Sequence, residues 1–215
     1  MKKISRYDIS ELIEAQFELG SRGRVLKNRL GIKSKREMDK IEAREQIRAL
    51  EELSCIYNRD HRFTASDVCR IHKIWLGLIY EWAGQYRQVN ITKGDFPFAA
   101  ARQVPRLMAE LEKGPLRKYT PCLFQSHTDI VKSIAVVHTE LVLIHPFREG
   151  NGRTARMLAT LMALQAGLPP LDFNGIKGKR RQEYVVAIHA GLDNNYELME
   201  KIFDAVIRRT LRTQK

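Results

Sequence analysis

Residues 145–156 hold the side chains in this sequence with the clearest chemical use, and they read His-Pro-Phe-Arg-Glu-Gly-Asn-Gly-Arg-Thr-Ala-Arg. The segment combines an imidazole, a carboxylate, a glycine-bearing turn and the arginines Arg153 and Arg156. An imidazole can take a proton near neutral pH, and guanidinium groups bind phosphate oxygens in pairs. This combination predicts a site that holds a polyphosphate while another group attacks it.

Two helices must position this segment. Apolar residues recur at steps of three and four between residues 130 and 144, which predicts an amphipathic helix. Pro146 cannot continue that helix, so His145 is expected at its C-terminal end. A second apolar helix follows over residues 157–164 and is ended by Gly167 and the prolines after it.

The turn into the second helix is predicted to be an anion site. Gly150, Asn151 and Gly152 would form this turn, because glycines allow unusual backbone angles and a close approach of N–H groups to a ligand. Arg153 and Arg156 lie on one face of the first helical turn, where each opposes the helix dipole at a cost of about 0.3–1 kcal/mol. A bound polyphosphate would reverse these unfavourable terms. The alternative is that both arginines pair with surface carboxylates.

The remaining side chains of the segment fit the same interpretation. Magnesium bound to phosphates usually takes only one or two protein carboxylates, which is a role for Glu149. Beside a phosphate site, His145 is a plausible general base. The alternatives are a solvated loop glutamate and a histidine that only caps its helix. Phe147 is expected to point into the core between the two helices, without a chemical role.

The segment resembles the signature of the Fic family, H-x-F-x-[D/E]-G-N-G-R-x-x-R, and fills every specified position. Fic proteins are mostly α-helical and typically transfer AMP from ATP to a Ser, Thr or Tyr hydroxyl of a target protein. The resemblance implies that His145 deprotonates the hydroxyl and that Glu149 holds Mg²⁺ on the α- and β-phosphates. It implies that the glycine turn and Arg153 cradle the phosphates, while Arg156 meets the outer phosphate and orients the α-phosphate.

A second feature of the family lies upstream of the signature. Residues 85–98 follow a helix expected to end near Gly84, and their composition predicts a short β-hairpin. In Fic proteins this hairpin is a flap that takes the target protein as an added strand. The residues assigned here to target binding are Asn90, Ile91, Thr92 and Phe96. Lys93 matches a flap lysine near the nucleotide, and an ordinary solvated loop lysine is the alternative.

The predicted fold is mainly α: a Fic-type helical bundle with a small β-hairpin flap beside the active-site loop. Ser34 and Glu37 form a capping-box pattern before a helix that runs to about Tyr57. A weaker pattern at Thr64 precedes apolar residues that continue to Trp82. Further helices are expected over 104–111, 184–192 and 197–211. We divide the chain into an N-terminal helical extension (1–63), a Fic domain (64–207) and a basic C-terminal tail (208–215).

Composition limits the partners. The 215 residues carry a formal net charge of +12, concentrated in residues 22–36, 177–181 and the tail. Nucleic acid is the obvious competitor for such charge, but aromatic interleaving and zinc-finger or zipper spacing are missing. No apolar run is long enough to span a membrane. The charged N-terminus and the scattered, odd number of cysteines, 3 in all, suggest a cytoplasmic protein with reduced thiols.

The N-terminus raises the question of control. Many Fic proteins carry, or receive from a partner, an inhibitory helix with the pattern [S/T]-x-x-x-E-[G/N], whose glutamate pairs with the second signature arginine, here Arg156. The nearest match is Ser10 to Ala15, in which Glu14 would be the inhibitory carboxylate and Ala15 departs from the pattern. Glu14 as an exposed helix residue is the alternative. Inhibition would then come from a separate small antitoxin protein.

Two other functions remain open at the level of sequence. Fic relatives can move a phosphate or a phosphocholine by binding the nucleotide differently. A kinase-like relative has Lys at the position of Gly152, so this sequence favours AMP transfer. A non-enzymatic nucleic-acid-binding or adaptor protein that has kept the signature as a scaffold is the other alternative.

Overall fold

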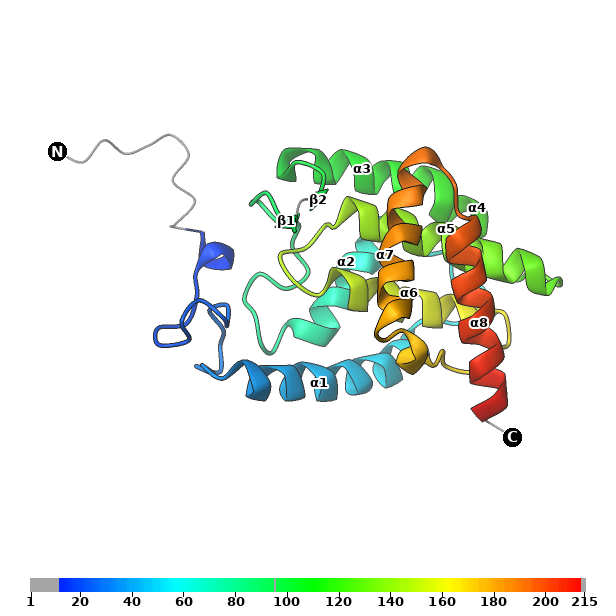
Figure 1. Ribbon diagram of the computed structural model, residues 1–215. Coiled ribbons are helices and arrows are strands. Elements are labelled where there is room, and N and C mark those ends of the chain that lie inside the picture. The colour runs from blue at the N-terminus through cyan, green and yellow to red at the C-terminus, as the bar shows by residue number, and fades with distance from the viewer. Residues whose placement is uncertain (1–11, 95, 214–215) are drawn as a thin grey trace.

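Helices dominate the structure, a computed structural model that describes residues 12–94 and 96–213. The central pair is α5 (His127–Ile144) and α6 (Asn151–Gln165), which pack against each other. Most side chains of both helices are buried. Figure 1 shows α1 along one side of the bundle, α3 along the opposite side, and α7 and α8 in front of the central pair. The predicted mainly α fold with one small hairpin is confirmed.

The N-terminal side of the bundle is built by α1 (Lys35–Ile56) and α2 (Ala65–Leu76). Ser34 accepts a hydrogen bond from the Glu37 N–H, and Thr64 forms a complete capping box with its partner three residues later. The α2 helix stops well before Trp82, contrary to the sequence prediction. It ends at Gly77, a residue of low helix propensity, and the chain continues as turns that still bury Trp82. The apolar spacing up to Trp82 therefore reflects burial of these side chains and not a continuous helix.

The hairpin is short. Strand β1 (Thr92–Lys93) pairs antiparallel with β2 (Phe96–Pro97), in the register Thr92 to Pro97 and Lys93 to Phe96. The predicted hairpin is thus confirmed. The hairpin lies beside the loop between α5 and α6. Phe98, just after β2, stacks on His145 with 3.6 Å between ring centroids.

The rest of the chain completes the helical layers. The first helix after the hairpin, α3 (Val104–Leu111), continues through a π-helical turn (Glu112–Leu116) into α4 (Arg117–Tyr119). After α6, the chain forms α7 (Lys179–Ala190) and α8 (Glu197–Thr213), which pack together and onto α5. The predicted boundary at residue 207 falls inside α8, and residues 208–213 continue the helix. None of the described helices is long and apolar enough to cross a membrane.

Two buried histidines make the core sensitive to acid. His72 and His138 are at most 1% exposed, and burial lowers the pKa of each to about 3. The native state therefore keeps both rings neutral, whereas the unfolded chain takes up protons below a pH of about 6.5. The stability that the two neutral rings contribute is fully present above a pH of about 6.5 and is lost as the pH falls from there towards 3.

We expect the free energy of unfolding to decline between pH 7 and pH 4, by up to about 1.4 kcal/mol per pH unit for each buried histidine. Denaturant titrations at several pH values measure this slope. His138→Asn should make the decline shallower by about one group. A slope that is the same in the wild type and in His138→Asn would contradict the assignment.

Candidate functional site

Two residues with a left-handed backbone conformation lie at the ends of the loop between α5 and α6. His145, the C-cap of α5, has φ 52° and ψ 59°, and Gly150, the N-cap of α6, has φ 82°. A non-glycine residue rarely adopts such angles, so His145 needs support from its surroundings. The loop between them turns the chain back so that the start of α6 lies next to the end of α5.

The support comes from buried polar groups. Arg87, 2% exposed, donates from Nε to the His145 carbonyl (2.7 Å) and through its other nitrogens to Val89 O (2.9 Å) and Ala99 O (2.5 Å). Asn151 closes the loop from the other end. Its Oδ1 accepts from the Phe147 N–H at 2.8 Å, and its Nδ2 donates to the Phe147 carbonyl at 2.7 Å. Arg87 and Asn151 therefore fix both ends of the loop.

Phe147 holds the loop from inside. Its ring is fully buried, as predicted, and stacks on His72 with 3.9 Å between centroids. His72 accepts at Nδ1 from the Gly84 N–H (2.8 Å), which leaves Nε2 to donate to the Glu149 carbonyl (3.1 Å). This neutral histidine therefore ties α2 to the loop.

The His145 side chain is arranged as a proton acceptor. Nδ1 lies 3.1 Å from the Val142 carbonyl, so this nitrogen carries the hydrogen and the lone pair is on Nε2. Burial, with the nearby cations of Arg87 and Lys93, lowers the pKa of His145 to about 4. The imidazole is neutral at pH 7, and Phe98 covers one of its faces.

The two glycines of the turn do different work. Only Gly150 has a left-handed backbone, and a Cβ there would lie 2.7 Å from the Trp75 ring. The sequence prediction of an unusual backbone at both glycines is wrong for Gly152, which lies inside α6 with Asn151. Open space surrounds the position of a Gly152 Cβ, so its missing side chain leaves room in front of the helix. Gly150 therefore allows the turn into α6, and Gly152 leaves space for a ligand in front of the helix.

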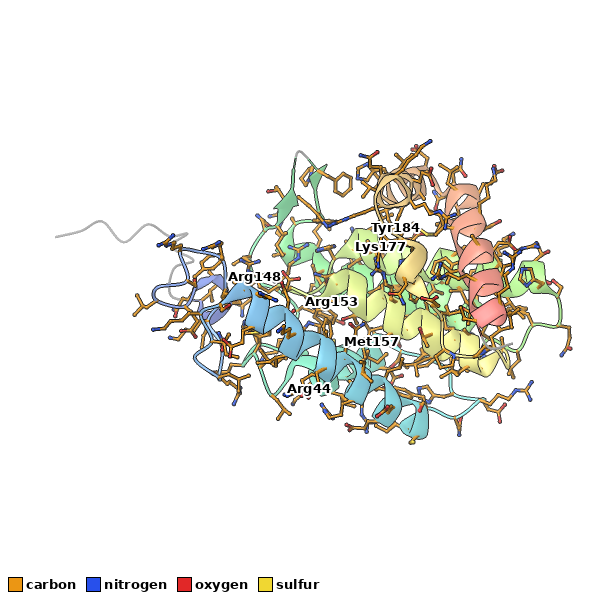
Figure 2. The ribbon with its side chains drawn as sticks, turned by 60° about the horizontal axis from the view of Figure 1, so that its bottom comes forward. Arg44, Arg148, Arg153, Met157, Lys177 and Tyr184 are labelled. Carbon is orange, nitrogen blue, oxygen red and sulfur yellow. The ribbon has the colours of Figure 1, made fainter. Side chains whose placement is uncertain are left out.

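The two signature arginines also differ. Arg153 donates from Nη1 to the Glu42 carboxylate at 2.6 Å and lies 4.6 Å over the Trp75 ring. Its Nη2 lies 3.5 Å from Glu149 Oε1, which also accepts from the Gly150 N–H at 2.9 Å. In Figure 2 Arg153 lies between α1, drawn in blue, and α6, drawn in yellow.

Arg156 has no carboxylate partner among the ion pairs of the described residues. Its Nε is buried without a hydrogen-bond partner in that part of the chain. The guanidinium lies 5.6 Å from the ring centroids of both Phe173 and Tyr184. A buried donor without a partner is costly, and an anion in the adjoining space would satisfy it.

Two adjoining cavities open beside the loop. The loop cavity, about 480 Å³, is lined by the loop, the start of α6 and the flap. The α7 cavity, also about 480 Å³, extends under α7 and has apolar walls that include Ile176, Tyr184 and Ile188. Both cavities share the same six residues: Lys93, Phe98, His145, Gly152, Arg156 and Arg181. One continuous space thus joins a cationic half to an apolar half, with His145 at the junction.

The predicted flap residues lie around this space in different ways. Ile91 and Thr92 line the loop cavity. Phe96 stacks on His189 of α7 with 4.3 Å between centroids, which connects the flap to the far wall of the α7 cavity. Asn90 turns its Oδ1 to the Ala101 N–H at 2.9 Å. A small cavity of about 270 Å³ runs along residues 89–92.

The inhibitory prediction fails on geometry for Glu14, and Ser10 lies outside the described residues. Glu14 is 5% exposed, which also contradicts the alternative of an exposed helix residue. It lies in the 3₁₀ turn η1 (Ile13–Ala15), and its Oε1 accepts from the N–H groups of Gln88 (2.6 Å) and Val89 (3.1 Å). These two N–H groups hold Oε1 at the base of the flap, and no ion pair between Glu14 and Arg156 is observed.

Sequence reasoning missed several residues of this site. Arg181 lines both cavities but carries no signature, and only the basic run 177–181 pointed to it. Glu42 and His72 lie far from the signature in sequence and within ordinary helical patterns, so no local signal marks them. The role of Arg87 follows from the structure, in which its buried guanidinium donates to backbone carbonyl groups.

Comparisons with known proteins agree with this geometry. The sequence model of the Fic/DOC family matches residues 62–163. The probable protein adenylyltransferase y4lH of Sinorhizobium fredii is 31% identical over 172 residues, covering 78% of this chain and 84% of that protein. The chain belongs to the Fic/DOC family.

Other relatives extend this result. The protein adenylyltransferase VbhT of Bartonella schoenbuchensis is 31% identical over 192 residues, which cover 87% of this chain but only 37% of VbhT. The chain thus spans about a third of that longer relative. The crystal structure of BepC from Bartonella tribocorum with bound AMPPNP is 25% identical, with a TM-score of 0.67, and the match covers 84% of this chain and 91% of BepC. This Fic/DOC chain is therefore related to protein adenylyltransferases in sequence and to a Bartonella effector protein with bound AMPPNP in fold.

The close contact at Gly150 gives a direct test of the loop. We expect Gly150→Ala to destabilise the fold by about 1–3 kcal/mol, because its Cβ would meet Trp75 and alanine resists a left-handed backbone. Gly152→Ala, placed in open space two residues later, should not lower thermal stability and should impair nucleotide binding instead. Equal losses of stability in both variants would contradict this division of roles.

Proposed function

We propose that this protein transfers AMP from Mg-ATP to a Ser, Thr or Tyr hydroxyl of a target protein. The junction of the two cavities supports this function most directly. A neutral imidazole lies there between a cationic space for phosphates and an apolar space for a nucleobase. Curated relatives named as protein adenylyltransferases and a relative with bound AMPPNP support the same substrate.

The cations divide among the phosphates. Arg156 would bind the outer phosphate, because its Nε lacks a partner, and Lys93 and Arg181 would contact the chain of phosphates from the flap and α7. Arg153 and the N–H groups at the start of α6 would bind the inner phosphates. Positioning and charge neutralisation of this kind supply most of the catalysis in phosphoryl-type reactions.

The donor set also fits magnesium. Glu149 lines the loop cavity with a side chain that is 46% exposed, and its Oε1 already accepts the Gly150 N–H. The second carboxylate oxygen could ligate Mg²⁺ together with phosphate oxygens, as is usual for this ion. When bound, the ion would supply further positive charge at the α- and β-phosphates.

His145 performs the proton transfer. Its Nε2 takes the proton from the target hydroxyl as the hydroxyl oxygen bonds to the α-phosphorus. The bond from that phosphorus to the bridging oxygen breaks, and pyrophosphate leaves with the electron pair. Because the Nδ1 hydrogen is held by Val142, the ring keeps the tautomer that this step needs.

The target would bind along the flap. An extended segment added beside residues 89–92 would lie over the 270 Å³ cavity there and direct its hydroxyl towards His145. A separate antitoxin could silence the enzyme by placing a carboxylate against Arg156. No carboxylate in the described residues forms an ion pair with this arginine.

Labelled ATP tests the reaction. With ATP labelled in the α-phosphate, we expect label on protein, and with γ-labelled ATP we expect none. His145→Ala should lower transfer at least about 100-fold and leave ATP affinity nearly unchanged, because the base acts on the hydroxyl. Arg156→Ala should weaken ATP binding. Transfer of the γ-label, or loss of ATP binding in His145→Ala, would contradict the proposal.

The position of Glu14 predicts the opposite of relief from inhibition. Glu14→Gly leaves two flap N–H groups without their acceptor, so we expect slower transfer than in wild type. Glu18→Gly is the matched control, because Glu18 lies in the same segment and accepts from Asn28 instead of the flap. Faster transfer by Glu14→Gly would show that Glu14 does act as an internal inhibitor.

A further inference from the structure

Glu42 is a carboxylate buried deep in the fold yet bonded to the phosphate site. It belongs to α1 and is 1% exposed. Oε2 accepts from Arg153 Nη1 at 2.6 Å, and Oε1 accepts from the Tyr80 hydroxyl at 2.7 Å. A buried carboxylate persists only when it is paired and hydrogen-bonded, and both oxygens of Glu42 meet this condition.

The backbone of Glu42 is anchored as well. Its carbonyl accepts from the indole nitrogen of Trp75 at 2.8 Å, and the same ring lies under the guanidinium of Arg153. Trp75 is also the side chain that a Cβ at Gly150 would strike. Glu42 therefore holds the edge of the Arg153 guanidinium and Trp75 lies against its face, while Tyr80 holds Glu42.

These contacts leave the working side of Arg153 available. A guanidinium has five N–H donors in a fixed plane, and the hydrogen bonds to Glu42 and Glu149 use only some of them. Arg153 still lines the loop cavity. The ion pair on one edge and the ring on one face hold this planar cation in a fixed orientation towards the phosphates, which lowers the entropy lost in reaching the transition state.

Glu42 also balances charge in the empty site. The loop cavity is lined by the five cationic side chains of Lys93, Arg148, Arg153, Arg156 and Arg181, with Glu149 as its acidic member. Arg153 and Arg156 follow each other on one helix face, where like charges repel. Without Glu42, repulsion would push Arg153 away from the start of α6. The carboxylate holds it there before the nucleotide binds.

We propose that Glu42 is a positioning residue of the active site: it orients Arg153 towards the phosphates, so α1 is part of the catalytic apparatus. The proposal rests on the function proposed above. It predicts a loss in the rate of transfer rather than in ATP binding, because the neutral amide that E42Q introduces would leave the cavity more positive and still attractive to ATP.

A double-mutant cycle between Glu42 and Arg153 tests this role. We expect E42Q to lower the transfer rate at saturating ATP about 10-fold while the KM for ATP changes less than about 2-fold. In an R153A background, E42Q should cause no further loss. Rates are compared per folded protein, counted by ATP-binding stoichiometry in calorimetry. Independent, multiplying losses would show that Glu42 does not act through Arg153, and an unchanged rate per folded protein would show that Glu42 only stabilises the fold.

Glu45 provides the matched control. It lies three residues further along α1, is 8% exposed and pairs with Arg48 at 2.7 Å, away from the phosphate site. E45Q should reduce stability and leave the rate per folded protein unchanged. If E42Q does not fold, Tyr80→Phe removes one hydrogen bond from the carboxylate and should lower the rate about 2- to 3-fold, again only when Arg153 is present.

Failure of this proposal can be told apart from failure of the proposed function. Wild type that transfers the γ-phosphate would overturn AMP transfer alone, and the cycle would then be measured on that reaction. Wild type that transfers AMP normally, with E42Q at the full rate, would overturn only the role of Glu42. Wild type that does not bind ATP would overturn both.

Discussion

The excess of positive charge around the first turn of α6 is the condition on which the rest of the site depends. Arginines and a lysine line one cavity with Glu149 as the acidic side chain among them, and the positive end of a helix dipole adds to their repulsion. Such an arrangement is unfavourable while empty and becomes favourable when an anion enters. The fold must therefore hold these groups in place, and the chain does so with buried hydrogen bonds rather than with surface ion pairs.

Those hydrogen bonds come from segments well separated in sequence. Arg87 holds the carbonyl of His145, His72 holds the carbonyl of Glu149, and Glu42 holds the side chain of Arg153. The last of these residues lies before the segment that the Fic/DOC sequence model matches. The N-terminal part of the chain thus contributes to the site as well as to the core, although the sequence suggested only a helical extension.

What the sequence could predict is what local chemistry dictates. Pro146 and the glycine turn placed His145 at a helix end, and the apolar periodicity located both central helices, because these signals act within a few residues. Long-range contacts leave no such signal. The partner of Arg153 is 111 residues away, and that of Glu14 is 74 residues away, so neither follows from spacing. At Gly152 the prediction confused a need for space with a need for unusual backbone angles.

We infer that this cationic space holds a polyphosphate. Calorimetric titration of the wild-type protein with ATP and with adenosine, at low and at moderate salt, tests it most directly. We predict that ATP binds at least about 100-fold more tightly than adenosine and that added salt reduces this advantage, since the difference comes from charge. Equal affinity for the two ligands, unaffected by salt, would show that the cationic space does not bind phosphates.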